Sequence, residues 1–416
     1  MKFWALILSV FTFVGVSSFS SSSVAVSNRI EEKQSEKKVK KACIGQKKYG
    51  ENSDYIVTTE SDEIKIMSYN VENLFDTIHD EGRDDYEFLP IDSAEKEKCD
   101  FKKGYYKEAC QKTDWTDDRL ELKLSQIKKV VEAQGELPDM LAVLEVENVN
   151  VVSQLADYLG YPKFLVTSGE DKRIELAVLY KEDKVKLKEM KEVKIVFPSE
   201  VGQKNTRNIL VANFISLKNK DQMIGLYVNH WPSQASPSVT RVTAAKHIRK
   251  TIDQFSKKYK DNYHVVAVGD FNTIEKDSPK PFDIIQDKEW EYSLLDVEQK
   301  YRKSSYKKDP NNMLKKMAPS SYYYSGDGTW NHLDRIFVSS NLVDNKGMEV
   351  MTETFRILAP DFVLKSVTPK SKKDETEESR AKACTFSAPK RYFHNATNPN
   401  AAGFSDHMGL IVKLKL

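Results

Sequence analysis

The feature that most constrains this chain is a short apolar run that ends abruptly in polar residues. Val265 to Val268 is followed directly by Gly269-Asp270-Phe271-Asn272, a pattern typical of a buried strand with a polar tip. Because side chains alternate along a strand, we expect Asp270 and Asn272 to lie on one face. A carboxylate beside an amide suits metal-assisted attack on a phosphate, since the first handles charge or a proton and the second orients an oxygen. Taken alone, the pattern fits an ordinary turn equally well.

The same arrangement recurs at other apolar stretches along the chain. Each of them ends in Asn, Glu, His or Asp at the edge of an expected strand. The polar ends are Asn70-Val71-Glu72-Asn73 after Ile64–Tyr69, Glu145 after Met140–Leu144, Asn229-His230-Trp231 after Ile224–Val228, and, near the C-terminus, His332-Leu333-Asp334-Arg335 and Ser405-Asp406-His407. Polar groups gathered at the strand ends of a two-layered sheet build a site, whereas scattered surface polar residues would not recur at that place.

These motifs, in this order, resemble those of the endonuclease/exonuclease/phosphatase superfamily, from about Ile64 to the C-terminus. The superfamily includes pancreatic-type deoxyribonucleases, abasic-site endonucleases, sphingomyelinases and inositol-polyphosphate phosphatases, so the motifs are specific for the superfamily and poorly specific for the substrate. The resemblance implies an α/β fold, a four-layer α/β-sandwich with two central, mainly antiparallel sheets packed face to face and helices outside.

Apolar spacing independently predicts helices between the strands. Residues 117–134 carry apolar side chains at intervals of three and four, which is typical of an amphipathic helix, and residues 239–255 repeat the pattern. Residues 174–180 alternate weakly and predict a further strand. Strands interleaved with helices that pack outside them favour mixed α/β layers.

The resemblance implies a hard divalent cation bound by oxygen ligands, Mg²⁺ with Mn²⁺ as the alternative. Glu145 matches the principal metal ligand of the family, with Asn70 and Asp406 close by. Glu72 stands where some abasic-site endonucleases carry Asp, which makes it a candidate second ligand. A zinc site is disfavoured, because no two cysteines have metal-ligand spacing.

The resemblance also implies the catalytic roles. His407 is expected to be the general base or a phosphate-orienting imidazolium, held by Asp334, which would fix its tautomer. His230 is expected to face the other side of the phosphate, where it stabilises charge or protonates the leaving group. Asp270 and Asn272 complete the catalytic set.

Three further residues are candidates for substrate binding. Arg241 opens the helix after His230, where the family often has a basic residue, and is a candidate phosphate ligand. Glu175 is a candidate to orient His230. Arg391 lies in the segment 389–394 shortly before the last motif, so we expect it to reach the substrate; an ordinary surface loop is the alternative.

The N-terminus has the features of an export signal. Lys2 precedes an apolar run from Phe3 to Val16, and Ser23 and Ala25 have small-residue cleavage spacing, which predicts a signal peptide over residues 1–25. We therefore expect a secreted or periplasmic protein with no stable membrane insertion after signal removal. An uncleaved N-terminal anchor is the alternative.

The rest of the chain reads as an arm and one domain. Residues 26–62 are rich in Lys, Glu and Ser and predict a charged, solvated arm. The catalytic domain is expected over residues 63–416, as a monomer. A polar insertion at 79–115 directly follows a motif-bearing strand tip, so it should cover or border the site.

An even cysteine count in an exported chain predicts disulfides. The chain has 4 cysteines. Cys99 and Cys110 flank a short polar segment, so that pairing is favoured over the others, which leaves Cys43 with Cys384.

Together these features predict an exported, metal-dependent phosphodiesterase, and most simply an endonuclease that hydrolyses DNA or RNA with an activated water. Export, the expected disulfides and the basic-aromatic segment 390–393 favour nucleic acid, although the net charge of +2 provides no strong whole-protein field. A sphingomyelinase-like or inositol-phosphatase-like hydrolase is the alternative. A non-catalytic binding module would require a lost catalytic residue, and every motif residue is present.

Overall fold

The computed structural model describes residues 48–168, 173–202, 206–305, 312–367 and 385–416. The expected signal peptide, the first part of the arm, Cys43 and Cys384 lie outside the described residues, and so does the charged stretch 370–382. No helix of the described residues is long and apolar enough to cross a membrane.

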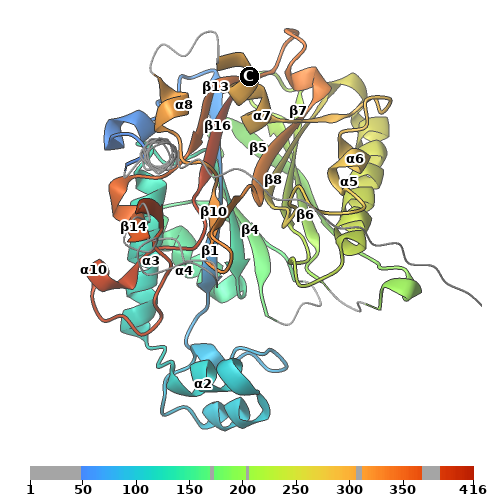
Figure 1. Cartoon of the computed structure of the whole chain (residues 1–416). Helices are drawn as coiled ribbons and strands as arrows, with labels where there is room; N and C mark the ends of the chain where they lie inside the picture. Colours follow the sequence, from blue (N-terminus) through green and yellow to red (C-terminus); the bar gives the residue numbers. More distant parts are fainter. Residues whose placement is uncertain (1–47, 169–172, 203–205, 306–311, 368–384) are drawn as a thin grey trace, which may run out of the picture.

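Two mixed sheets form the centre of the fold (Figure 1). The first sheet has the order β13 (Glu349–Ile357), β16 (Leu410–Lys415), β1 (Glu63–Leu74), β2 (Met140–Val146), β4 (Glu175–Tyr180) and β3 (Lys163–Val166). The second has the order β5 (Val185–Val193), β6 (Ile209–Ser216), β7 (Met223–His230), β8 (Tyr263–Asp270), β12 (Asp334–Ser339) and β9 (Leu294–Asp296). Each sheet has a parallel pair, β1 with β2 and β7 with β8, and its other pairs are antiparallel.

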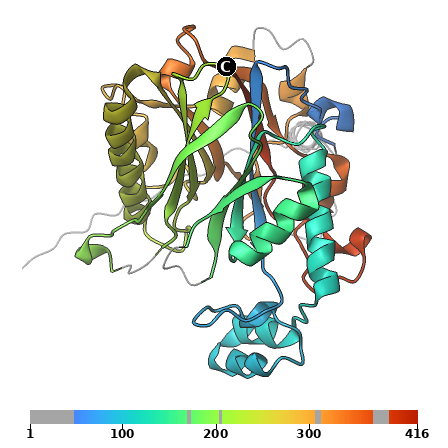
Figure 2. The ribbon, with the colours of Figure 1, turned by 180° about the vertical axis from the view of Figure 1, so that it is seen from behind.

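Helices cover the outer faces of both sheets, as the two opposite views show (Figures 1 and 2). The first sheet carries α3 (Asp117–Glu132) and α4 (Val149–Leu159), and the second carries α5 (Ser238–Tyr259). The predicted four-layer sandwich is therefore confirmed. The shorter elements are η1 (Asn52–Tyr55), η4 (Ser199–Val201), η5 (Lys260–Asn262), α6 (Phe282–Ile285), α7 (Val297–Ser305), α8 (Met313–Lys316), β10 (Tyr322–Tyr324), β11 (Thr329–Asn331), η6 (Ser340–Leu342), η7 (Asp361–Val363), β14 (Leu364–Val367), β15 (Phe386–Pro389) and α10 (Pro399–Ala402).

Strand β8 shows why the motif-bearing strands read as continuous apolar runs. Val266 and Val268 belong to the core between the two sheets, whereas Val265 and Ala267 pack in the layer beneath α5. Both faces are buried, so both alternating sets are apolar. Only the tip of such a strand can carry a polar side chain into an open site.

The insertion forms a small helical subdomain after β1, below the sandwich in Figure 1. It contains η2 (Tyr86–Phe88), η3 (Ala94–Phe101) and α2 (Gly104–Lys112). The favoured disulfide between Cys99 and Cys110 is present, and it joins η3 to α2.

The folded domain begins before residue 63. Tyr49 and Tyr55, in the described end of the expected arm, are buried, and the Tyr55 hydroxyl donates to the carbonyl of Ala359 (3.0 Å). Burial of these two rings fixes this part of the expected arm against the domain.

Candidate active site

Strand register brings three of the predicted residues side by side. His230 at the end of β7 pairs with Asp270 at the end of β8, and Asp270 pairs with Asp334 at the start of β12. The polar tips of three adjacent strands therefore form one row at the edge of the second sheet. This row exists because β7 and β8 are parallel and end together, while β12 runs back from the same edge.

The first sheet contributes Asn70 and Glu145 from the parallel pair β1 and β2. The amide of Asn70 donates to Glu145 Oε1 (2.9 Å), and the backbone N–H of Asn73 donates to Glu145 Oε2 (3.2 Å). Glu72, Asn73 and Glu145 all have left-handed backbone conformations, with φ of 55°, 62° and 65°. Such conformations are costly outside glycine and gather where a site requires a particular backbone path.

Side chains from both sheets surround the carboxylate of Asp270. Its Oδ2 lies 3.7 Å from His230 Nε2 and 3.8 Å from His407 Nε2. His230 Nε2 is also 3.7 Å from Glu145 Oε1. His407 comes from the loop before β16 in the first sheet, so residues far apart in the chain surround this one carboxylate.

His407 is held by the residue that the sequence predicts. Its Nδ1 donates to Asp334 Oδ2 (2.7 Å), and the hydroxyl of Ser321 donates to the same oxygen (2.6 Å). The ring of Tyr322 lies 4.7 Å from the imidazole ring, between ring centroids. These contacts fix the orientation of His407 and leave its Nε2 facing Asp270.

Burial and neighbouring charges shift the pKa values of the two histidines in opposite directions. Burial alone would lower the pKa of His407, but the carboxylates of Asp334, Asp406 and Asp270 together outweigh it and raise that pKa well above its usual range. Burial, together with the positive charges of Arg207 and His407, holds the pKa of His230 well below its usual value. At neutral pH the site therefore contains one imidazolium, His407, and one neutral imidazole, His230.

Asp270 has the pKa of a group that can exchange a proton near neutral pH. Burial raises its pKa to about 7, with a further contribution from Asp334 and an opposing one from His407. A carboxyl group tuned to this range is matched to general-base chemistry.

Asn272 is positioned by a turn and not by strand alternation. Strand β8 ends at Asp270, and Asn272 has a φ of 46°. Its backbone N–H donates to Asp270 Oδ1 (2.8 Å), and its side-chain amide donates to the carbonyl of Trp231 (3.0 Å). The expectation that Asp270 and Asn272 share one face of a strand is therefore wrong, because the strand ends before Asn272. Both residues nevertheless lie at the edge of the site.

A second acidic group, Glu72, anchors the segment that carries Arg391. Arg391 pairs with Glu72, and its Nη2 lies 3.3 Å from Asp406 Oδ2. Glu72 also accepts from the backbone N–H groups of Tyr392 (3.0 Å) and Asp406 (2.9 Å). These contacts use the Glu72 carboxylate to hold the chain around the last motif, which leaves its role as a second metal ligand a prediction.

The donor set fits the expected metal best at Glu145. In the described part of the chain, no group of three or more His, Cys, Asp or Glu side chains is arranged to hold a metal ion. Mg²⁺ needs fewer, because it is usually bound by one or two carboxylates together with water and substrate oxygens. Glu145 would hold it, with Asn70 orienting the carboxylate. Asp406 is turned towards Arg391, so its role as a ligand stays a prediction.

Two of the candidate substrate contacts have other partners. The Arg241 guanidinium is buried and pairs with Asp277 (2.7 Å), and it also donates to the carbonyls of Ser233 and Ser236. The expectation that Arg241 binds phosphate is therefore wrong, because its side chain holds the loop before α5. Glu175 accepts from Thr167 (2.6 Å) and lies 3.5 Å from Arg83, and its role in orienting His230 stays a prediction.

Sequence reasoning missed two residues, Lys123 and Ser321, that hold the site residues in position. Lys123 of α3 is buried and donates to the carbonyl of Val71 (2.5 Å) at the tip of β1. A signal for it existed, since Lys123 follows Leu120 by three residues and precedes Ile127 by four, which places it on the inward stripe of the helix. Ser321 gave no signal, because nothing in its local sequence links it to Asp334.

The chain matches the model of a family described as the endonuclease/exonuclease/phosphatase family over residues 65–415. Solved structures similar to this chain include such a family protein from Bacteroides thetaiotaomicron, with 13% identity and a TM-score of 0.47 over 85% of this chain and 97% of that one. They also include the catalytic domain of human Nocturnin with a bound sulfate anion (12%, 0.46, 86% and 96%) and a Bacteroides thetaiotaomicron mannosyl-6-phosphatase (14%, 0.45, 85% and 100%). No curated protein matches the chain.

Proposed function

Since the chain belongs to the endonuclease/exonuclease/phosphatase family, and is therefore a phosphoester hydrolase, we propose that it is a divalent-metal-dependent phosphodiesterase acting on nucleic acid outside the cytoplasm. The observation that carries the proposal is the placement of Asp270 between His230 and His407, with Glu145 beside them. The disulfide between Cys99 and Cys110 supports an oxidising compartment. Both the compartment and the nucleic-acid substrate are proposals.

The residues divide the work of hydrolysis among them. Asp270 accepts a proton from the attacking water, because its pKa near 7 lets it do so at neutral pH. His407 is an imidazolium that neutralises charge on a phosphate oxygen, which is the second of the two roles expected from the sequence. His230 is neutral and offers a hydrogen bond to another phosphate oxygen. A divalent ion bound at Glu145 would supply further charge neutralisation when present.

Arg391 supports a substrate with more than one charged or polar contact. Its side chain is exposed at the mouth of the site, with 63% of its surface accessible, while its guanidinium faces Glu72 and Asp406. An arginine in this position can donate to a sugar or base of an extended chain. A nucleic-acid polymer offers such groups beside the scissile phosphate, whereas a small phosphomonoester does not.

A panel of substrates tests the proposal. Purified protein with Mg²⁺ should hydrolyse single-stranded DNA, RNA or plasmid DNA, and should do so faster than sphingomyelin or phosphoinositides. EDTA and the Glu145→Gln variant should each reduce the rate. Preferential hydrolysis of a lipid headgroup would replace the nucleic-acid assignment, and no hydrolysis of any phosphodiester would refute the proposal as a whole.

A further inference from the structure

The insertion subdomain is held rigidly beside the active site. Its disulfide joins Cys99 to Cys110, and Lys96 Nζ donates to the carbonyls of Glu87 (2.9 Å), Cys110 (3.0 Å) and Thr113 (2.7 Å). At its end, the indole N–H of Trp115 donates to the carbonyl of Phe75 just beyond β1 (3.1 Å). Helix α2 therefore has a fixed position relative to the strand that carries the first motif.

Two adjacent tyrosines at the start of α2 face solvent. Tyr105 and Tyr106 are 79% and 65% exposed, and their ring centroids lie 5.9 Å apart in an edge-on arrangement. Their rings contribute little to the core of the subdomain, since so much of their surface remains in water. Neighbouring exposed aromatic rings on a rigid support are typical of binding surfaces.

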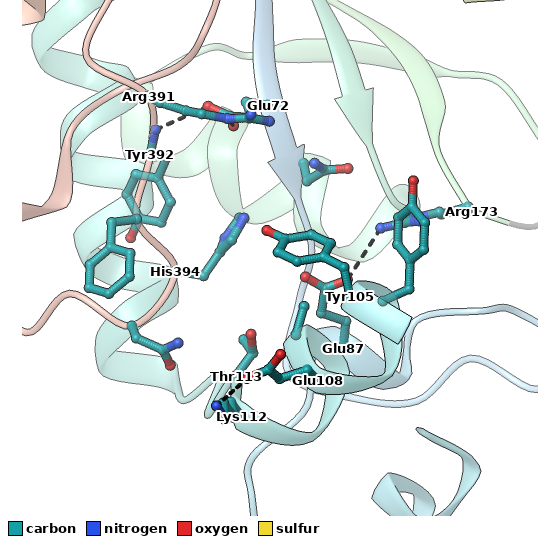
Figure 3. A pocket seen from close by; sticks show the side chains of 15 residues that line it. Glu72, Glu87, Tyr105, Glu108, Lys112, Thr113, Arg173, Arg391, Tyr392 and His394 are labelled. Atoms are coloured by element: carbon teal, nitrogen blue, oxygen red, sulfur yellow. Dashed lines mark hydrogen bonds and ion pairs between the residues drawn. The ribbon is translucent and has the colours of Figure 1, made fainter. Parts of the chain in front are cut away.

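These rings line a cavity of about 600 Å³ that reaches Glu72 and Asn73 at the end of β1. The opposite wall is the segment 391–395, which includes the exposed ring of Phe393, and the inner end is formed by Glu72 and Asn73. Figure 3 shows the ring of Tyr105 reaching into this space towards His394, with Arg391 and Glu72 at one end. Aromatic rings therefore stand on both sides of the cavity.

Two contacts connect the cavity directly to the reacting centre. The backbone N–H of Asn73 donates to Glu145 Oε2 (3.2 Å), and Arg391 Nη2 lies 3.3 Å from Asp406 Oδ2. A group bound in the cavity would thus be separated from Glu145 and Asp406 by single lining residues, Asn73 and Arg391. The cavity is the natural place for the part of the substrate that adjoins the scissile phosphate.

The charges in the cavity favour an uncharged ring over another phosphate. Each lining cation faces an acid: Arg173 lies 3.5 Å from Glu87, Lys112 lies 2.5 Å from Glu108, and Arg391 pairs with Glu72. Paired charges leave little net positive potential for an anion. The aromatic rings are therefore the main binding groups of the cavity, and they suit a flat, weakly polar ligand.

We propose that the cavity binds an unpaired nucleobase next to the scissile phosphate, stacked on Tyr105 or Tyr106, so that the protein prefers single-stranded nucleic acid. The inference rests on the proposed function. A base inside a duplex is paired and stacked on its neighbours, and it cannot enter without being extruded. Because every base has a π-face, stacking supplies affinity with little sequence preference.

The test combines variants of the protein with changes in the substrate. Oligonucleotides with and without abasic spacers beside one cleavable phosphodiester are hydrolysed by the wild type, by Tyr105→Ala/Tyr106→Ala and by Tyr105→Phe/Tyr106→Phe. We expect the alanine variant to lose about 5- to 150-fold in kcat/KM on the oligonucleotide with bases, mostly through KM. It should lose little on the abasic oligonucleotide, and the phenylalanine variant should behave as the wild type.

Phe101→Ala provides the matched control. Phe101 is 81% exposed on the same subdomain and does not line the cavity, so its loss should leave kcat/KM unchanged. An alanine variant that cleaves both oligonucleotides at the wild-type rate, or loses equally on both, would overturn the inference while the proposed function stands. If the wild type cleaves no nucleic acid but hydrolyses another phosphodiester, both the nucleic-acid assignment and the inference fail.

Discussion

Removal of the Asp334 carboxylate should weaken catalysis chiefly through loss of its contact with His407. The two side chains share a buried hydrogen bond of 2.7 Å between a carboxylate and an imidazolium. A hydrogen bond to a charged group contributes on the order of 1.5–3 kcal/mol. Since about 1.4 kcal/mol corresponds to a tenfold change in rate, Asp334→Ala should lower kcat by about 10- to 150-fold.

A double-mutant cycle shows whether the loss of rate in Asp334→Ala arises through His407. His407→Ala should lower kcat by about 100- to 10,000-fold, the usual range for acid–base and charge-stabilising groups. Once His407 is absent, Asp334 has no imidazole to hold, so the double variant should be no slower than His407→Ala alone. The coupling energy should therefore equal nearly the whole effect of Asp334→Ala.

Ser321→Ala is the control, because it removes a different hydrogen bond to the same Asp334 carboxylate. It removes the other hydrogen bond to Asp334 Oδ2 (2.6 Å), a neutral contact of about 1 kcal/mol, so kcat should fall less than tenfold. Single-turnover cleavage of a labelled oligonucleotide measures all of these rates. Additive losses for Asp334 and His407, or strong coupling of Asp334 to His230 in place of His407, would refute the reasoning.

The remaining predictions concern the metal, the pH profile, the disulfide and export. Glu145→Gln should raise the Mg²⁺ concentration needed for half-maximal rate while the melting temperature stays the same, measured by Mg²⁺ titration; an unchanged titration would contradict the assignment. The pKa of Asp270 is raised to about 7, so its carboxylate form is lost as pH falls, and kcat/KM should fall about tenfold per unit below pH 7; a flat profile from pH 5 to 7 would contradict this role. Cys99→Ser/Cys110→Ser should expose the insertion to trypsin, because closing such a loop stabilises by about 2–3 kcal/mol, and proteolysis at the wild-type rate would contradict it. Mass spectrometry of the protein from its native host should show an N-terminus near Val26, and a chain beginning at Met1 would contradict cleavage of a signal peptide.

The polar strand tips could be predicted because their signal is local. An apolar run ending in Asp270 or Glu145 marks the point where a buried strand leaves the core, and the sequence shows that change directly. The order of the motifs then implied the fold, which the structure has. The disulfide between Cys99 and Cys110 was likewise a short-range inference.

The residues that were predicted wrongly or missed have roles that depend on partners distant in the sequence. Arg241 could bind phosphate or an acid, and only folding places Asp277 against it. Ser321 supports Asp334 through a hairpin whose position the local sequence does not encode. Tyr105 lies in an insertion whose placement beside Glu72 depends on packing, so its cavity was invisible before the fold was known.

The most direct test of the central claim compares catalysis and stability in Asp270→Asn. The pKa of this carboxyl group is about 7 in the folded protein and near 4 when unfolded, so the folded state holds the proton more tightly. Folding stability contributed by the protonated form is therefore lost as pH rises through 7, and an uncharged amide avoids that loss.

At pH 8 we expect Asp270→Asn to unfold with a free energy equal to that of the wild type, or higher by up to about 4 kcal/mol, while its single-turnover rate falls by about 100- to 10,000-fold. That result would show a carboxylate kept for chemistry at a cost to the fold. A variant that retains more than about a tenth of the activity, or that loses activity only together with its stability, would contradict the account.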